Sequence, residues 1–298
     1  MLDPQTLYTV DPDVRDSLRG EHPVLVHQLD GYIDAGSVAR DTRLFLLDHC
    51  VHEVLAEFDV DQLHDYRSRR PQLVFDTNHW SGMVSYSLTL HKMTDANGVP
   101  FLLLGGPEPD SQWHRAAAAV MQLCEDLDVR MLVATSGIPM AIPHTRPTLV
   151  TQHSTDPSLV AGNPIWIDRV QLPGSFSHML EYMAGEAGIL ARGFVAHVPH
   201  YLAQTVFPQA ILEGLHRIRD ATGLNFPLGD IEMATAENLM TIASETASDN
   251  DFPTLVAALE EQYDRLRETG AASVPSAEEI GAVVEQFLAE QDPPDRAR

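Results

Sequence analysis

Short apolar runs alternate with turns and amphipathic segments along the first three quarters of the chain. An apolar run at 23–28 predicts a buried strand, and the turn after it leads into an amphipathic helix at 37–49 with Ser37 as its cap. The same patterns predict strands at 51–58, 73–76, 83–93, 99–104, 131–135, 149–153, 165–170 and 193–198, and helices at 111–127, 176–187 and 208–222.

This alternation of strands and helices predicts an α/β fold, a three-layer sandwich around a mixed sheet. Asn97-Gly98 is a tight-turn signal between two predicted strands, so part of the sheet is expected to be antiparallel. The segment 137–147 is rich in proline and is expected to be a loop.

Beyond residue 228 only helical periodicity remains, with helices predicted at 231–248, 252–269 and 277–290. Residues 228–298 hold 16 acidic and 4 basic side chains, a net charge of -12. We therefore predict an α/β domain at 1–228 and an acidic helical C-terminal subdomain at 229–298. The acidic excess is interpreted as a solvated helical face, with an acidic docking surface as the alternative.

The charge of the whole chain is also strongly negative, with 43 acidic against 19 basic residues and a formal net charge of -24. Such a field repels a phosphate backbone, so nucleic acid is not an expected partner. The apolar runs fall short of the roughly 20 residues that a membrane span needs, and residues 1–4 do not begin a signal peptide, so we expect a cytoplasmic protein with no membrane partner. Cys50 and Cys124 are interpreted as free thiols.

Against this acidic background, the segment 65–71 places three arginines within four positions. Clustered guanidiniums repel one another and usually have anionic partners. Three kinds of partner are open: carboxylates of the same chain, a neighbouring subunit, or a phosphate or carboxylate of a ligand.

Candidate functional side chains follow the predicted strands, where open α/β sheets collect their ligands. They are Asp34, Tyr66, Arg67, Arg69, Arg70, Glu108, Asp110, His144, Arg146 and His200. In one interpretation the arginines clamp an anion, while glycines let the backbone approach it near a helix N-terminus. In the other, which we favour, the arginines pair with Asp30, Asp34, Asp61 or Asp65 and hold loops or subunits together.

The sequence contains no complete catalytic or cofactor motif. Residues 134–138 lack the first glycine and the following helix of a nucleophile elbow, and Lys92, the one lysine, is not in a phosphate-binding loop. His197 and His200 have a His-x-x-His spacing, but Pro199 prevents a regular helix, and a strand would point the two rings to opposite faces. We therefore expect no cofactor and no metal.

Four segments in the right order carry a resemblance to a known family: 29–36, 65–71, 137–147 and 198–201. The chain resembles the proteasome-assembly-chaperone-like family, in its actinobacterial branch. The resemblance implies a phosphorylase/hydrolase-like fold, similar to purine nucleoside phosphorylases and peptidyl-tRNA hydrolases, and a tendency to self-associate. Some relatives bind the proteasome core through a hydrophobic-Tyr-any residue tail. This chain ends in Asp295-Arg296-Ala297-Arg298, so that contact is not carried over.

Together these features favour a non-enzymatic, self-associating protein that acts through protein contacts as an assembly factor or chaperone. We expect a homo-oligomer, with a trimer as the specific prediction, and a protein client. The alternative is a nucleoside phosphorylase-like enzyme or a small-anion-binding protein that uses the loop Arg67–Arg70.

Overall fold

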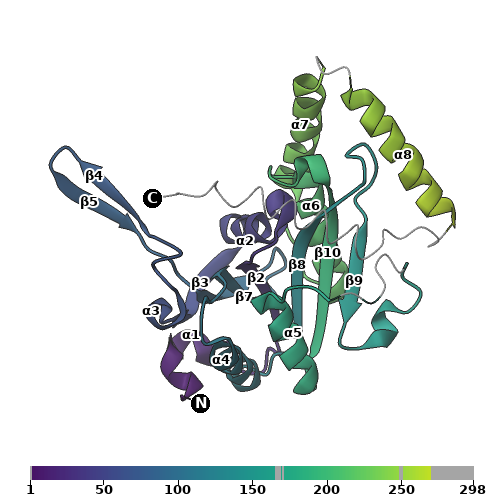
Figure 1. The fold of residues 1–298 in the computed structure, drawn as a ribbon. Coiled ribbons are helices and arrows are strands. Elements are labelled where there is room, and N and C mark those ends of the chain that lie inside the picture. Colours follow the sequence, from purple (N-terminus) through teal and green to yellow (C-terminus); the bar gives the residue numbers. More distant parts are fainter. Residues whose placement is uncertain (1, 165–168, 170, 248–250, 270–298) are drawn as a thin grey trace. The chain divides into compact units, whose positions relative to one another are not determined.

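The computed structural model describes residues 2–164, 169, 171–247 and 251–269, and it has a mixed α/β architecture (Figure 1). In this part of the chain one eight-stranded sheet has the strand order β1-β3-β6-β7-β2-β8-β10-β9. The strands are β1 (Tyr8–Val10), β2 (Val24–Asp30), β3 (Val51–Phe58), β6 (Thr89–Thr94), β7 (Pro100–Pro107), β8 (Met131–Met140), β9 (Val150–Ser154) and β10 (Leu190–Pro199). The predicted mixed α/β fold is confirmed.

The chain divides into two compact units that are each discontinuous in sequence. Unit 1 comprises Met1–Gly31, Cys50–Val133 and Gly174–Ala191, and unit 2 comprises Tyr32–His49, Ala134–Pro173 and the chain from Arg192 onward. The predicted boundary between 228 and 229 stays a prediction.

Unit 1 is built on the parallel pair β2 and β7, which antiparallel β6 and β3 extend. Its helices are α1 (Pro12–Asp16), α3 (Val60–Leu63), α4 (Trp113–Asp126) and α5 (Phe176–Glu186). The alanine-rich face of α4 lets α5 approach closely, and Leu102, Ala116 and Leu180 are fully buried in the shared core. Cys124 lies in this core, and it and Cys50 are free thiols, as predicted.

Unit 2 contains α2 (Val38–His49), α6 (Pro208–Thr222), α7 (Gly229–Glu245) and α8 (Phe252–Thr269). Helix α6 packs against both α2 and α7, and Val38, Val198 and Phe207 belong to one of the cores of this unit. Gly137 of β8 has no side chain because a Cβ there would lie 2.0 Å from the carbonyl oxygen of Ala35.

A two-stranded ribbon in unit 1, which we call the arm, consists of β4 (Gln72–Asp76) and β5 (His79–Val84). It extends from the region of α3 (Figure 1), and every residue of both strands is exposed. Leu73 faces Met83 and Phe75 faces Trp80 across the ribbon, and a bulge between Val74 and Phe75 keeps both pairs on one face. We call these four residues the apolar face of the arm.

The arm corrects one of the strand predictions. The sequence predicts a single strand at 83–93, but β5 ends at Val84 and β6 begins at Thr89. The sequence pattern does not reveal this break. Apolar and polar residues alternate in the arm with the same period as in a strand that covers a core. The prediction of a loop from 137 was also wrong at its start, since β8 continues to Met140.

The N-terminus of α2 is capped differently from the prediction. Gly36 and Ser37 both have positive φ, which turns the chain so that Asp34, not Ser37, accepts the N–H groups of Ala39 and Arg40, at 2.9 and 3.1 Å. The strand predicted at 165–170 and the helix predicted at 277–290 lie outside the described residues, apart from position 169.

Candidate functional site

The predicted site residues fall into two groups, and each group lies within one unit. Tyr66, Arg67, Arg69, Arg70, Glu108 and Asp110 belong to unit 1, and Asp34, His144, Arg146 and His200 belong to unit 2.

In unit 1, Asp110 holds the loop that leads into the arm. Its Oδ1 accepts a hydrogen bond from Nε of Arg69 at 2.9 Å, and its Oδ2 accepts the backbone N–H of Asp65 at 2.8 Å. Both side chains of this ion pair are largely covered, with 27% of Arg69 and 18% of Asp110 exposed. The carboxylate therefore fixes one guanidinium and the turn that begins the loop.

Glu108 lies just beyond the carboxyl end of β7, next to the start of α5. Its Oε2 accepts the backbone N–H of Phe176 at 2.9 Å, and its own N–H donates to the carbonyl oxygen of Asp30 at 3.1 Å. Glu108 is 8% exposed, and burial raises the pKa of its carboxyl group. The first free N–H of α5 is thus satisfied by a carboxylate of the chain itself.

The other basic residues of the loop differ from Arg69. The side chains of Arg67 and Arg70 are exposed, and neither guanidinium forms a hydrogen bond or ion pair within the part of the chain that the structure describes. The hydroxyl group of Tyr66 donates to Oδ1 of Asp61. The loop therefore carries one neutralised arginine and two arginines whose charges no described residue pairs.

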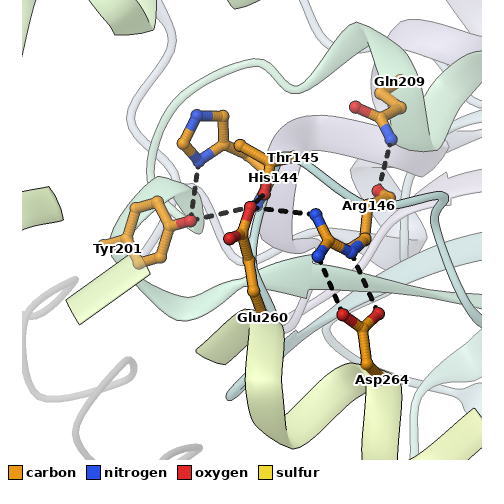
Figure 2. A network of polar contacts seen from close by, with 7 residues as sticks. All are labelled: His144, Thr145, Arg146, Tyr201, Gln209, Glu260 and Asp264. Atoms are coloured by element: carbon orange, nitrogen blue, oxygen red, sulfur yellow. Dashed lines mark hydrogen bonds and ion pairs between the residues drawn. The ribbon is translucent and has the colours of Figure 1, made fainter. Parts of the chain in front are cut away.

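In unit 2, His144 forms a compact network with Tyr201 (Figure 2). The Tyr201 hydroxyl accepts the backbone N–H of His144 at 3.0 Å and lies 2.8 Å from Nδ1 of the same residue. Since the hydroxyl already accepts the amide, its proton can be donated to Nδ1, which selects the neutral ring. Burial lowers the pKa of His144 and raises that of Tyr201, and Phe252 of α8 stacks on the imidazole.

Beside this network, Arg146 is held by two carboxylates of α8 (Figure 2). Nε and Nη2 donate to the two oxygens of Asp264 at 3.0 and 2.8 Å, and Nη1 donates to Glu260 at 2.9 Å. Gln209 donates to the carbonyl oxygen of Arg146 at 2.9 Å. The guanidinium presents its fork to Asp264, so a ligand anion would have to replace that carboxylate.

The remaining predicted residues have simpler surroundings. The carboxylate of Asp34 caps α2, as described above, so the chain itself occupies this helix N-terminus. His200 is exposed and packs edge-on against Tyr201, with ring centroids 5.3 Å apart. Whether any of the predicted residues binds a ligand or a second chain stays a prediction.

Several residues of these networks were not predicted from the sequence. Tyr201 lies in a segment that carried the family resemblance, but Glu260 and Asp264 lie more than 110 residues from Arg146 in sequence. Their spacing of four residues places both carboxylates on one face of a helix, and this spacing is the sequence signal that could have identified them as a pair. Their arginine partner cannot be identified from that spacing.

A buried histidine outside these networks makes stability depend on pH. His197 of β10 is 1% exposed, its Nε2 lies 2.8 Å from the hydroxyl of Thr151, and burial lowers its pKa to about 4. Below a pH of about 6.5 this histidine is protonated in the unfolded chain but stays neutral in the folded chain. The free energy of unfolding therefore falls as the pH falls toward 4. We expect this residue to lower the free energy of unfolding by about 2–3 kcal/mol between pH 7 and pH 4.5.

Urea denaturation at the two pH values, with wild type and His197→Asn compared, measures this contribution. Because carboxylates also titrate in this range, the relevant quantity is the difference between the two proteins in the loss of stability. Equal losses would show that the histidine does not contribute.

Two further observations concern membrane spans and metal sites. Among the described residues no helix is long and apolar enough to cross a membrane. No group of three or more histidine, cysteine or acidic side chains in the same part of the chain could hold a metal ion.

The chain matches the model of the PAC2 family over residues 28–245. A Mycobacterium tuberculosis protein of unknown function is 38% identical, with 96% of this chain and 97% of that chain covered and a TM-score of 0.84. A proteasome-assembly chaperone homologue from the same organism is 22% identical, with 79% and 99% covered and a TM-score of 0.71. A Pyrococcus furiosus archaeal proteasome activator is 14% identical, with 80% and 97% covered and a TM-score of 0.59. No curated protein gives a significant match.

Proposed function

The chain belongs to the PAC2 family, and we propose that it acts without catalysis, as a self-associating assembly factor or chaperone that works through protein contacts. The relatives described as a proteasome-assembly chaperone homologue and as a proteasome activator support this role, since both descriptions name a protein assembly as the partner. We further propose that the oligomer is a trimer, that it has a protein client and that it resides in the cytoplasm.

The apolar face of the arm is the observation that carries this proposal. Leu73, Phe75, Trp80 and Met83 are 52, 57, 64 and 60% exposed, and the rings of Phe75 and Trp80 meet edge to face with centroids 5.0 Å apart. An isolated two-stranded ribbon is marginally stable in water, and exposed apolar patches mark sites of protein contact. A second copy of the chain that covers this face would both stabilise the ribbon and remove its apolar side chains from water.

The charges at the base of the arm favour a second copy over other partners. Arg67 and Arg70 are exposed cations with no partner among the described residues, whereas the chain as a whole carries a net charge of -24. Another copy therefore offers many carboxylates to these two guanidiniums.

Light scattering after size-exclusion chromatography tests the proposal. We expect the wild type to form an oligomer at micromolar concentration, and the double variant Phe75→Ser/Trp80→Ser to dissociate with a dissociation constant raised about a hundredfold or more, because aromatic anchors dominate interface energies. The thermal stability of the separated chain should change little, since both rings are exposed.

The opposite face of the arm provides a matched control. Val74 and Val84 are 53 and 61% exposed and lie on that face, so Val74→Ser/Val84→Ser removes apolar surface without touching the apolar face. This variant should keep the oligomer. A monomeric wild type, or equal dissociation of the two variants, would contradict the proposal.

A further inference from the structure

The oligomer proposed above leaves open which surface of the second copy receives the arm, and α7 has the properties that this contact requires. Asp230, Met233, Glu237 and Met240 follow one another at spacings of three and four residues, which places them on one face of the helix. The two methionine side chains are 61 and 66% exposed. We call these four residues the acidic methionine face.

The inner side of α7 is already occupied. Ile231 and Ile242 are 9 and 6% exposed, and the helix packs against α6. The acidic methionine face is therefore the side of α7 that the described residues leave uncovered. Helix α7 contains four acidic residues and no basic residue. On the acidic methionine face, Oδ2 of Asp230 pairs with Nε2 of His49 at 3.0 Å, and Glu237 adds a second carboxylate.

Like the acidic methionine face, the arm combines exposed apolar side chains with charged residues, but its charges are positive. Its apolar face ends at a base that carries Arg67 and Arg70, whose guanidiniums pair with no described residue, and the methionines of α7 are likewise flanked by carboxylates. Methionine adapts to irregular partners and forms favourable sulfur contacts with aromatic rings such as Phe75 and Trp80. Arginines at the edge of an apolar contact can pair with carboxylates of the partner, which fixes the register of the two surfaces.

We propose that the arm of one copy docks on the acidic methionine face of a second copy. This inference rests on the proposed self-association and names the surface through which it occurs. Because the two surfaces differ, the contact is heterologous, and a ring of three copies would use every arm and every α7 face once. A reciprocal pair of copies satisfies the same contacts, so oligomer mass separates the two arrangements.

Cross-linking with introduced cysteines tests the contact. Cys50 and Cys124 are 7 and 2% exposed, so an added surface cysteine is the accessible thiol. We would mix the variants Asn78→Cys, in the turn of the arm, and Ser244→Cys, near the end of α7, and add a short bis-maleimide. A covalent pair is expected in the mixture, at least tenfold above the yield from Asn78→Cys mixed with Glu125→Cys on α4.

The charges supply an independent readout. Glu237→Arg should raise the dissociation constant of the oligomer about tenfold, and combining it with Arg70→Glu should restore most of this loss. A wild-type monomer would contradict the proposed self-association itself. An oligomer that persists without the cross-link to Ser244→Cys above its control, or without any effect of Glu237→Arg, would overturn only the inference about α7.

Discussion

Replacing Arg115 by alanine is expected to lower the free energy of unfolding by about 4 kcal/mol. Arg115 is 4% exposed in unit 1, and its guanidinium donates to the carbonyl oxygen of Asp3, to the side-chain oxygens of Gln62 and Gln112, and to the hydroxyl of Thr6. All four acceptors are neutral, so within the described part of the chain the charge is stabilised by oriented dipoles rather than by an ion pair. Truncation removes these four hydrogen bonds and the buried methylene stem.

The consequences of this loss reach the base of the arm. Arg115 joins the N-terminal turn to α3 and to the start of α4, and the carbonyl oxygen of Leu63 accepts the backbone N–H groups of Asp110 and Ser111. Asp110 in turn holds Arg69. The variant should therefore loosen the loop that leads into the arm as well as the N-terminus.

Thermal and urea denaturation measure the effect, and a fall in melting temperature of roughly 10 °C is expected. Arg19→Ala is the matched control, because the side chain of Arg19 is 78% exposed and pairs with an exposed aspartate. That change should stay within about 0.5 kcal/mol. Equal effects of the two variants would show that the buried network does not stabilise the protein.

The predicted elements that are most accurate are those whose pattern is determined locally. The strand predicted at 51–58 coincides with β3, and the helix predicted at 208–222 coincides with α6, which begins with proline and ends before Gly223. A fixed φ suits the first turn of a helix, and a glycine with positive φ ends it. Each of these signals lies within the element or directly beside it.

The arm could not be predicted because its residues have the pattern of a core strand. The same sequence pattern would occur if the apolar face of the arm were covered by a core. In the structure no described residue buries these four side chains, and the sequence does not indicate this. β8 extends beyond its prediction for another non-local reason. Gly137 reads as the start of a loop, whereas its role is to admit the carbonyl oxygen of Ala35.

The candidate site shows the same division between local and distant information. A cluster of three arginines was evident at 67–70, but which of them is neutralised depends on Asp110, some forty residues away. Arg146 was predicted as a candidate site residue, and its partners in the structure come from a helix more than 110 residues later. Residue type therefore indicated where charge would be concentrated, and only the fold determined which carboxylate each cation meets.

Replacing Tyr263 by alanine is expected to release α8 from the rest of unit 2 without unfolding that unit. Tyr263 is 1% exposed, packs with Met140 and Ile142, and donates its hydroxyl to the carbonyl oxygen of Pro147 at 2.8 Å. Truncating a large buried aromatic side chain costs about 3–5 kcal/mol. Among the α8 side chains that the structure describes, Leu259, at 6% exposure, is the other buried one. We expect the amides of α8 to exchange a few hundred times faster.

Native-state hydrogen exchange followed by mass spectrometry separates α8 from α2 and α6, whose protection should not change. Tyr263→Phe keeps the ring and loses the hydrogen bond, so its effect should be about 1 kcal/mol. Loss of protection confined to α8 would show that α8 opens independently of α2 and α6, and a loss shared only with α7 would support the predicted helical subdomain at 229–298. Uniform loss across α2, α6 and α8 would instead make α8 part of one cooperative unit and contradict that division.

The ion pair beside Tyr263 adds a dependence on pH to the same experiment. Hydrogen bonds from Arg146 hold the pKa of Asp264 below its ordinary value, so this stabilisation is present above the pKa of the unfolded chain and is lost as the pH falls through the lower, folded pKa. Acid should therefore accelerate exchange in α8 of the wild type more than in Arg146→Met. Both side chains are partly exposed, so salt should weaken the difference, and a difference unaffected by both pH and salt would exclude the ion pair as its origin.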